Sequence, residues 1–182
     1  MAKYISKKEQ VENTIENLKN IVNKQNSDIA LPILKWTIEK IQLSYNEYLR
    51  NKRYFMSNRK DGKPRFVERG GIYRANLGKN VGSEQNGLIR PVLVVQEQSF
   101  NATSTTVLVI PLTDALDKNG KPKKKLKTHV DIEHKSLEKK SIIKVEHLRS
   151  ISKNRLKDKV CNIDDEKMKE VEEKLKLSLG IK

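Results

Sequence analysis

Three side chains between residues 90 and 147 are candidates to bind an anion or exchange a proton. Arg90 precedes the apolar run Pro91–Gln96, and its planar guanidinium can hold a phosphate through two hydrogen bonds. His129 and His147 can each hydrogen-bond a base or a phosphate, and an unperturbed histidine titrates at a pH of about 6.5. Residue types alone leave a second interpretation open, in which Arg90 pairs with a carboxylate and the histidines are ordinary surface residues.

The carboxylates and the cysteine indicate which chemistry to exclude. The acidic residues form no paired motif of the kind that holds Mg²⁺, so we expect neither a metal nor another cofactor. Cys161 is the only cysteine, which excludes an intramolecular disulfide and suits a reducing cytoplasm. No segment resembles a signal peptide, and the apolar stretches are too short to cross a bilayer. We therefore expect a cytoplasmic protein.

Positive charge is the strongest feature of the composition. The chain carries 38 Lys and Arg against 23 Asp and Glu, a formal net charge of +15. Such an excess favours a nucleic-acid partner, with simple solubility as the alternative. The segment Lys121–Lys127, which includes Lys123 and Lys124, is a predicted surface loop that can add salt-dependent affinity. The polar loop from Ser83 to Gly87 can hydrogen-bond unstacked bases, or it is an ordinary hairpin turn.

Strand-like runs and a final helix are predicted to position these residues. Short β-branched runs occupy residues 71–76, 91–96, 105–112, 128–132 and 141–145. Five such strands joined by polar loops predict a small antiparallel sheet curled into a barrel. Residues 151–156 predict a helical turn, and a last helix is predicted from the acidic residues 164–166 to Gly180. The fold class is therefore α+β, mainly β.

The first third of the chain has helical rather than strand-like periodicity. Apolar residues recur every three or four positions at Val11, Ile15, Leu18 and Val22, and again at Leu34, Ile38, Ile41, Tyr45 and Tyr48. The segment 57–65 has no apolar residue and contains Gly62 and Pro64, which is typical of a linker. We expect a helical hairpin over residues 1–56, a basic linker over 57–67 and the β domain over 68–182.

A family resemblance emerges from motifs in the β domain, taken in their order along the chain. These are Arg69-Gly-Gly-Ile-Tyr73, Gly82-Ser-Glu-Gln-Asn-Gly87, Arg90-Pro-Val-Leu-Val-Val-Gln96, Val107-Leu-Val-Ile-Pro-Leu-Thr113, Thr128-His-Val130, Ser141-Ile-Ile-Lys-Val-Glu146, Asp164-Asp-Glu166 and Ser178-Leu-Gly180. Together they resemble the MazF/PemK toxins over residues 68–181. The resemblance implies a small SH3-like β-barrel, related to the CcdB-like toxin fold, with a C-terminal helix. It also implies a homodimer whose paired barrels form an RNA groove.

The same resemblance implies an activity and a set of site residues. Members of the family cleave single-stranded RNA at selected sequences without a metal, leaving a 2',3'-cyclic phosphate and a 5'-hydroxyl. Arg90 matches the main catalytic residue and Thr113 its partner. The residues expected to contact RNA are Ser83, Glu84, Gln85, Asn86, His129, Glu146, His147, Lys123 and Lys124. The resemblance further implies an acidic antitoxin, and promoter DNA as a ligand of the toxin–antitoxin complex.

This sequence departs from the family pattern at four places. The turn before Arg90 is one residue longer at Leu88-Ile89, and the loop 114–127 is longer and richer in lysine. His147 stands where glutamine is common, and residues 1–66 have no counterpart in short members. Alternatives remain, namely a non-catalytic nucleic-acid-binding regulator and a topoisomerase-inhibiting toxin. The helical segment is either a built-in antitoxin or a dimerisation arm, and its basic charge favours the arm.

Overall fold

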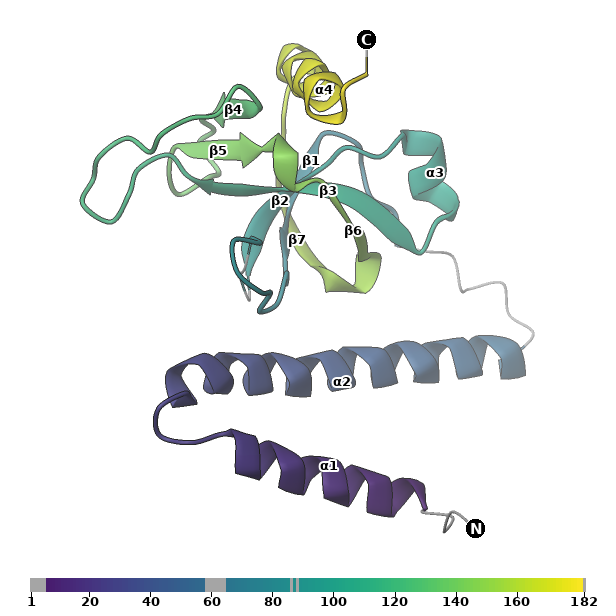
Figure 1. The fold of residues 1–182 in the computed structure, drawn as a ribbon. Helices are drawn as coiled ribbons and strands as arrows, with labels where there is room; N and C mark the ends of the chain where they lie inside the picture. The colour runs from purple at the N-terminus through teal and green to yellow at the C-terminus, as the bar shows by residue number, and fades with distance from the viewer. Residues whose placement is uncertain (1–5, 58–64, 86, 88, 182) are drawn as a thin grey trace. The chain divides into compact units, whose positions relative to one another are not determined.

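The protein is described from a computed structural model that covers residues 6–57, 65–85, 87 and 89–181 (Figure 1). Contacts within the chain divide it into two units, Met1–Gln42 and Leu43–Lys182, and each is described by itself. This division lies inside a long helix. The boundary predicted at residues 57–67 lies largely on residues outside the described ranges, so it stays a prediction.

The described part of the second unit contains a bent antiparallel sheet with the order β4-β5-β3-β2-β1-β7, and β6 pairs with β3 (Figure 1). The strands are β1 (Gly71–Ala75), β2 (Arg90–Val94), β3 (Thr106–Asp114), β4 (His129–Ile132), β5 (Ser141–Lys144), β6 (Arg149–Ser152) and β7 (Leu156–Asn162). Its two ends, β4 and β7, are not hydrogen-bonded to each other in the described strand pairing. The predicted barrel is therefore present as a strongly bent, open sheet.

Strand β3 organises the sheet because different parts of it pair with different neighbours. Its first half pairs with β6 from Thr106 to Val109, and its last three residues pair with β5. On its other edge β3 pairs with β2, where Val92 lies opposite Pro111. The short 3-10 helix η1 (Val145–His147) connects β5 to β6. This arrangement brings the start of β2, the end of β3 and the segment around η1 into one domain.

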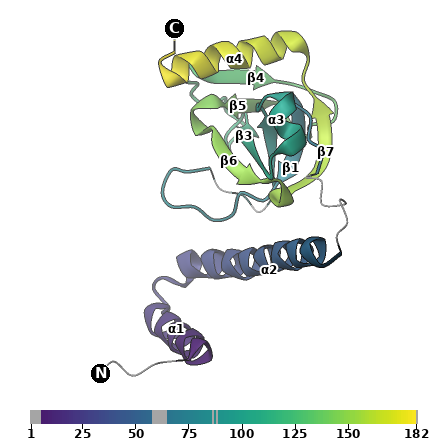
Figure 2. The same ribbon diagram turned by 90° about the vertical axis from the view of Figure 1, so that its right-hand side faces the viewer.

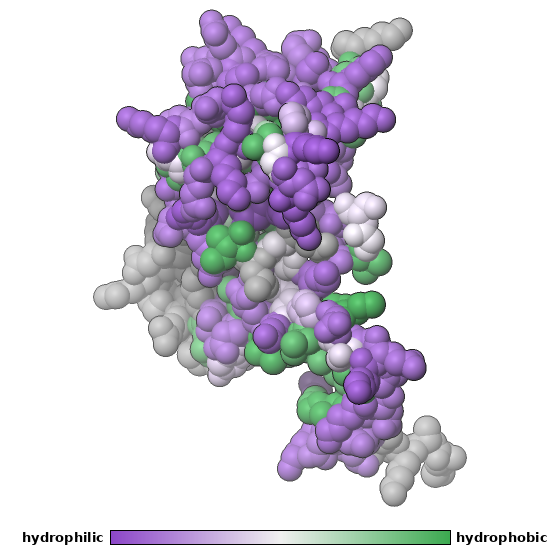
Figure 3. Space-filling view, turned by 90° about the vertical axis from the view of Figure 1, so that its left-hand side faces the viewer, coloured by the Kyte–Doolittle hydropathy of each residue, from purple (hydrophilic) through white to green (hydrophobic). Residues whose placement is uncertain are grey.

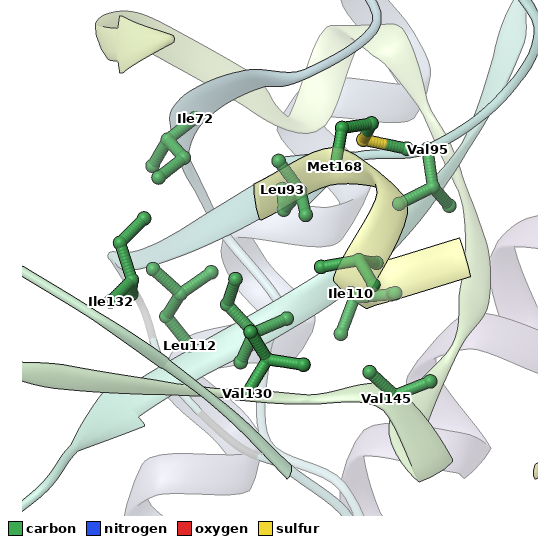
Figure 4. Packing of buried hydrophobic residues seen from close by; sticks show 11 residues of the cluster. Ile72, Leu93, Val95, Ile110, Leu112, Val130, Ile132, Val145 and Met168 are labelled. Carbon is green, nitrogen blue, oxygen red and sulfur yellow. The ribbon is translucent and has the colours of Figure 1, made fainter. Parts of the chain in front are cut away.

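The apolar side chains that the sequence assigns to strands form the core. Figure 4 shows Ile72, Leu93, Ile110, Leu112 and Val130 converging from four strands, with Met168 of α4 over them. A second buried cluster, which includes Tyr73, Val94 and Val107, occupies the opposite face of β1, β2 and β3. Burial of both faces explains why β2 and β3 have continuous apolar runs rather than strict alternation.

The final helix has the boundaries that its sequence predicts. The Asp164 carboxylate caps α4 (Asp165–Leu179) by accepting a hydrogen bond from the Lys167 amide, and Gly180 ends the helix in the left-handed conformation. Met168 and Val171 are buried, and the helix packs against β4 and η1 (Figure 2). This helix therefore covers one face of the sheet.

The strand count differs from the prediction. The described chain has seven strands rather than five, because β6 and β7 were not recognised, and a short helix α3 (Gln98–Thr103) was also missed. The turn predicted at residues 151–156 is helical only at η2 (Lys153–Arg155) and is flanked by these two strands. Most residues of β6 and β7 are partly or fully exposed. The sequences of β6 and β7 are as polar as those of loops. Only main-chain pairing with β3 and β1 makes these segments strands.

Both predicted N-terminal helices are present, as α1 (Lys7–Ile21) and α2 (Ser27–Ser57). Ser6 caps α1 through the Glu9 amide, and Asn26 donates to the Ile21 carbonyl oxygen at 2.8 Å in the turn that follows. Large apolar side chains remain exposed along these helices, at Val11, Ile15, Leu18, Ile21, Ile29, Leu31, Ile33, Ile38, Ile41, Tyr45 and Tyr48. Hydrophobic residues also stand out on this part of the space-filling view, whereas the sheet domain is mostly hydrophilic (Figure 3). Within the described residues, no helix is long and apolar enough to span a membrane.

A candidate RNA-cleavage groove

Arg90 and Thr113 lie at the adjacent ends of two paired strands. The antiparallel pairing of β2 with β3 sets Val92 opposite Pro111, and Arg90 and Thr113 each lie two residues beyond this pair. The Arg90 Nη1 atom donates to the Leu112 carbonyl oxygen at 3.0 Å, which ties its side chain across to β3. Two residues that are 23 positions apart in sequence are therefore neighbours because β2 and β3 pair.

Arg90 and Thr113 line one open groove of about 680 Å³. The other lining residues are Ile89, Pro91, Leu112, Asp114, Leu116, Asp117, Lys118, Lys123, Lys139 and Ser141. With Arg90 included, four lining side chains are cationic and two are acidic, so the groove is positive overall. Partial burial lowers the pKa of Arg90, and the nearby Asp114 carboxylate opposes that shift. The guanidinium nevertheless stays charged at neutral pH, because arginine is not deprotonated in proteins.

Gly87 leaves room for the Arg90 side chain. A Cβ atom at Gly87, which has φ +157°, would lie 3.1 Å from both the Cβ and Nε atoms of Arg90. Gly87 also forms an isolated bridge with Gly78, which closes the loop that precedes β2. Close packing against Gly87 therefore restricts the conformations that the Arg90 side chain can adopt.

The lysine loop does not behave as one uniform basic patch. The Lys123 ammonium lines the groove and donates to the Asp114 carbonyl oxygen at 2.8 Å, with the Thr113 Oγ1 atom 3.4 Å away. Lys124 is exposed and is not among the residues that line the groove. The structure thus separates two neighbouring lysines that the sequence treats as equivalent.

His129, Glu146 and their neighbours form a compact polar cluster. The His129 Nδ1 atom accepts from the Leu126 amide at 3.2 Å, so the neutral ring carries its hydrogen on Nε2 and donates it to Glu146 Oε1 at 2.9 Å. The Thr128 hydroxyl donates to the other carboxylate oxygen at 2.9 Å. Burial opposes ionisation of Glu146, but the hydrogen bonds from His129 and Thr128 outweigh it and lower the pKa of Glu146. The His129 side chain is only 7% exposed. Its contact with RNA stays a prediction.

A smaller pocket of about 290 Å³ collects several of the residues expected to contact RNA. Glu84, Gln85, Glu146 and His147 line it together with Leu148 and Arg149. Partial burial, aided by the charge of Lys144, lowers the pKa of His147, although Glu146 opposes the shift. At neutral pH His147 is therefore mainly uncharged. Ser83 is exposed in the same loop, and Asn86 lies outside the described residues.

Asp114 is a groove residue that the sequence analysis missed. Its main-chain oxygen holds Lys123, and its carboxylate Oδ2 atom lies 3.4 Å from the Lys139 ammonium. In the sequence, its position directly after Thr113 is the feature that could have identified Asp114 as a groove residue. Among the residues that the structure describes, no group of three His, Cys, Asp or Glu side chains is placed to hold a metal ion.

The bent sheet and its basic groove define a small β domain suited to hold a polyanion. Residues 68–179 match the family described as "PemK-like, MazF-like toxin of type II toxin-antitoxin system". Because this match spans more than half of the sequence, the chain belongs to that family of toxins. The first 67 residues precede the matched segment.

Individual proteins agree with this assignment. The chain is 44% identical over 117 residues to Endoribonuclease EndoA of Bacillus subtilis (strain 168), covering 63% of this chain and 96% of that protein. The crystal structure of MazF (Form-I) from Deinococcus radiodurans aligns with a TM-score of 0.53 and 22% identity, covering 64% of this chain and 98% of that one. An endoribonuclease from Mycobacterial species aligns with a TM-score of 0.50 and 19% identity, covering 65% of this chain and 95% of that one. The structural likenesses support the fold.

Proposed function

We propose that this toxin is a sequence-selective endoribonuclease that cuts single-stranded RNA without a metal ion. The observation that carries the proposal is the convergence of the Arg90 guanidinium and the Thr113 hydroxyl on one positive, open groove. The 44% identity to a protein named as an endoribonuclease, over 96% of its length, supports the same activity.

The chemistry needs only the RNA itself and fixed hydrogen-bond donors. The ribose 2'-hydroxyl loses its proton and attacks the neighbouring phosphorus, the bond from phosphorus to the 5'-oxygen breaks, and the leaving oxygen gains a proton. The products are a 2',3'-cyclic phosphate and a 5'-hydroxyl. Arg90 and Thr113 donate to the non-bridging oxygens, on which negative charge increases in the transition state. Arg90 is also the proposed proton carrier, by analogy with the family.

Sequence selectivity is assigned to the smaller pocket at Glu84, Gln85 and His147. Their carboxylate, amide and imidazole groups offer different donors and acceptors to the edge of an unstacked base. Arg149 at the same pocket adds a donor group that can reach a base or a phosphate. Lys124 is proposed to add affinity through the RNA backbone. Selectivity and cleavage would then reside in separate parts of the domain.

Partners follow from membership in a toxin–antitoxin family. An acidic antitoxin that covers the positive groove is the proposed inhibitor, because its charge complements the lining residues. A homodimer is the proposed active assembly, and promoter DNA is a proposed ligand of the toxin–antitoxin complex.

The test is cleavage of a long unstructured RNA in EDTA by the wild-type protein, with both product ends mapped. We expect cuts at one short motif with cyclic-phosphate ends. Arg90→Ala should lower the cleavage rate by about 10³-fold, because one preorganised donor to a developing oxyanion is commonly worth that much.

Arg74→Ala is the matched control, since Arg74 lies exposed on β1 and does not line the groove. It should cleave at nearly the wild-type rate. Cleavage that disappears in EDTA and returns with Mg²⁺ would refute the mechanism. Tight RNA binding without cleavage by the wild-type protein would favour a nucleic-acid-binding regulator, and neither binding nor cleavage would favour a toxin that inhibits a protein target.

A further inference from the structure

The lysine-rich segment after β3 is an ordered hairpin. Leu116 forms a bridge with Pro122, and the Lys123 amide donates to the Ala115 carbonyl oxygen at 2.9 Å. At the tip, Asp117 Oδ1 accepts from the amides of Asn119 and Lys121 at 2.8 and 2.9 Å. These bonds fix the main chain on both sides of the turn. The position of Lys123 is therefore set by the fold of the hairpin.

Lys123 differs from the other lysines of the hairpin in where its ammonium lies. Its side chain is half-buried, and its Nζ atom lies 2.8 Å from the Asp114 carbonyl oxygen and 3.4 Å from Thr113 Oγ1. It lines the groove together with Arg90. Lys118 also lines the groove but is exposed, as are Lys121, Lys124 and Lys125. Within the basic run 121–127, Lys123 is thus the lysine whose ammonium lies beside the Thr113 hydroxyl.

This contact determines what the Thr113 hydroxyl can do. An ammonium group has three donors and no lone pair, so the hydroxyl oxygen can only accept from Lys123. The single hydroxyl hydrogen of Thr113 then remains available for another acceptor in the groove. A non-bridging phosphate oxygen is such an acceptor. Lys123 therefore favours the rotamer of the hydroxyl that cleavage requires.

We infer that Lys123 is a positioning residue for RNA cleavage, which aims the Thr113 hydroxyl at the scissile phosphate and holds a positive charge next to it. The inference rests on the proposed function. A phosphodiester carries one negative charge. Attack by the deprotonated 2'-oxygen adds a second as the pentacoordinate phosphorus forms. A cation fixed near that phosphate stabilises the more highly charged state most, which raises the rate of the chemical step. Lys123 takes no part in the bond-breaking steps.

The experiment measures single-turnover cleavage in EDTA over a range of enzyme concentrations, using a short RNA that contains the motif mapped with the wild-type protein. Lys123→Met keeps the apolar stem but removes the donors and the charge. It should lower the rate at saturation about tenfold or more, with a smaller change in the concentration that gives half-maximal rate. Lys123→Arg should recover most of that loss, because a guanidinium also donates and cannot accept.

Two other lysines provide the comparison. Lys135→Met removes one positive charge from an exposed residue outside the groove and should leave the kinetics unchanged. Lys124→Met should weaken binding and its dependence on salt while leaving the rate at saturation within about twofold. If Lys123→Met and Lys124→Met behave alike, Lys123 acts only through overall charge and the inference is wrong.

A double-mutant cycle tests whether Lys123 acts through Thr113. In a Thr113→Val background, the replacement of Lys123 should lower the cleavage rate by a clearly smaller factor than in the wild-type background. Fully multiplicative effects would show that Lys123 does not act through Thr113, which overturns its assignment as a positioning residue. Thermal unfolding of each variant checks the fold, and Lys123→Ala replaces Lys123→Met if the latter is unfolded. Absence of cleavage by the wild-type protein would remove the proposed function itself, whereas unimpaired cleavage by the Lys123 variants removes only this inference.

Discussion

The groove at the ends of β2 and β3 and the cluster around Glu146 use charge in different ways. In the cluster, one carboxylate accepts hydrogen bonds from His129 and Thr128, with Lys144 and His147 each 3.7 Å from it. In the groove, Arg90 and Lys123 donate to main-chain oxygens, and cationic side chains outnumber acidic ones by four to two. The cluster is therefore suited to hold structure together. The groove is suited to attract and stabilise an anion.

This difference separates residues that look equally functional in the sequence. His129 and Arg90 both lie at the starts of strands, and both can bind phosphate. His129 is closed in by Leu126 and Glu146, whereas Arg90 lines an open groove. The environment, rather than the residue type, therefore determines how open each side chain is to its surroundings.

Among changes that leave Arg90 and Thr113 themselves in place, the largest effect on cleavage is expected at Gly87. Gly87→Ala places a Cβ atom 3.1 Å from Arg90 Cβ and Nε, so the guanidinium must move. Cleavage should fall about ten- to a hundredfold, because small displacements of a catalytic group are costly. Gly180→Ala is the control, since Gly180 has φ +67° and nothing within 4 Å of the added Cβ. Equal cleavage rates for the two variants would contradict the close packing of Gly87 and Arg90.

The cluster should respond to Glu146→Gln mainly through stability. Loss of the charge-assisted bonds to His129 and Thr128 should lower the free energy of unfolding by about 1–3 kcal/mol, measured by urea denaturation. Glu133→Gln is the control, because Glu133 pairs with Lys140 on the surface at 2.8 Å and should change stability little. A large loss of cleavage without loss of stability would show that Glu146 belongs with the groove.

The pH dependence of the Glu146→Gln effect has a definite sign. The folded state lowers the pKa of Glu146, so its stabilisation is present above the unfolded pKa of about 4.3 and is lost as the pH falls through the folded value. The difference in stability between wild type and variant should therefore shrink below a pH of about 4. Its persistence at lower pH would exclude the carboxylate as the cause.

The smallest effect is expected at His147. The folded state lowers its pKa through burial and through Lys144, with Glu146 opposing and His129 and Arg149 adding to the shift. Protonation is then easier in the unfolded chain, so the wild-type protein should lose stability as the pH falls from about 6.5 through the folded pKa. His147→Gln should be less sensitive to acid over that range, as measured by urea denaturation at several pH values. Identical pH profiles for the two proteins would contradict this assignment.

Much of the β domain could be predicted because its signals are local. Continuous apolar runs predicted β2 and β3, and the Asp164 and Gly180 caps bounded α4 within a residue. Strands β6 and β7 escaped prediction because most of their side chains are at least partly exposed and only pairing with distant strands stabilises them. The family resemblance supplied Arg90 and Thr113. Neither composition nor spacing would have joined them.

The sequence by itself determined the family, the two N-terminal helices and the strands with apolar runs, because motifs and periodicity are properties of neighbouring residues. Tertiary structure alone decided which charged groups share a site. It brought Arg90 and Thr113 into one groove through the pairing of β2 with β3, closed His129 against Glu146, and selected Lys123 from a run of lysines through the hairpin bonds. These outcomes depend on how segments pair and pack in three dimensions, which periodicity and composition do not encode.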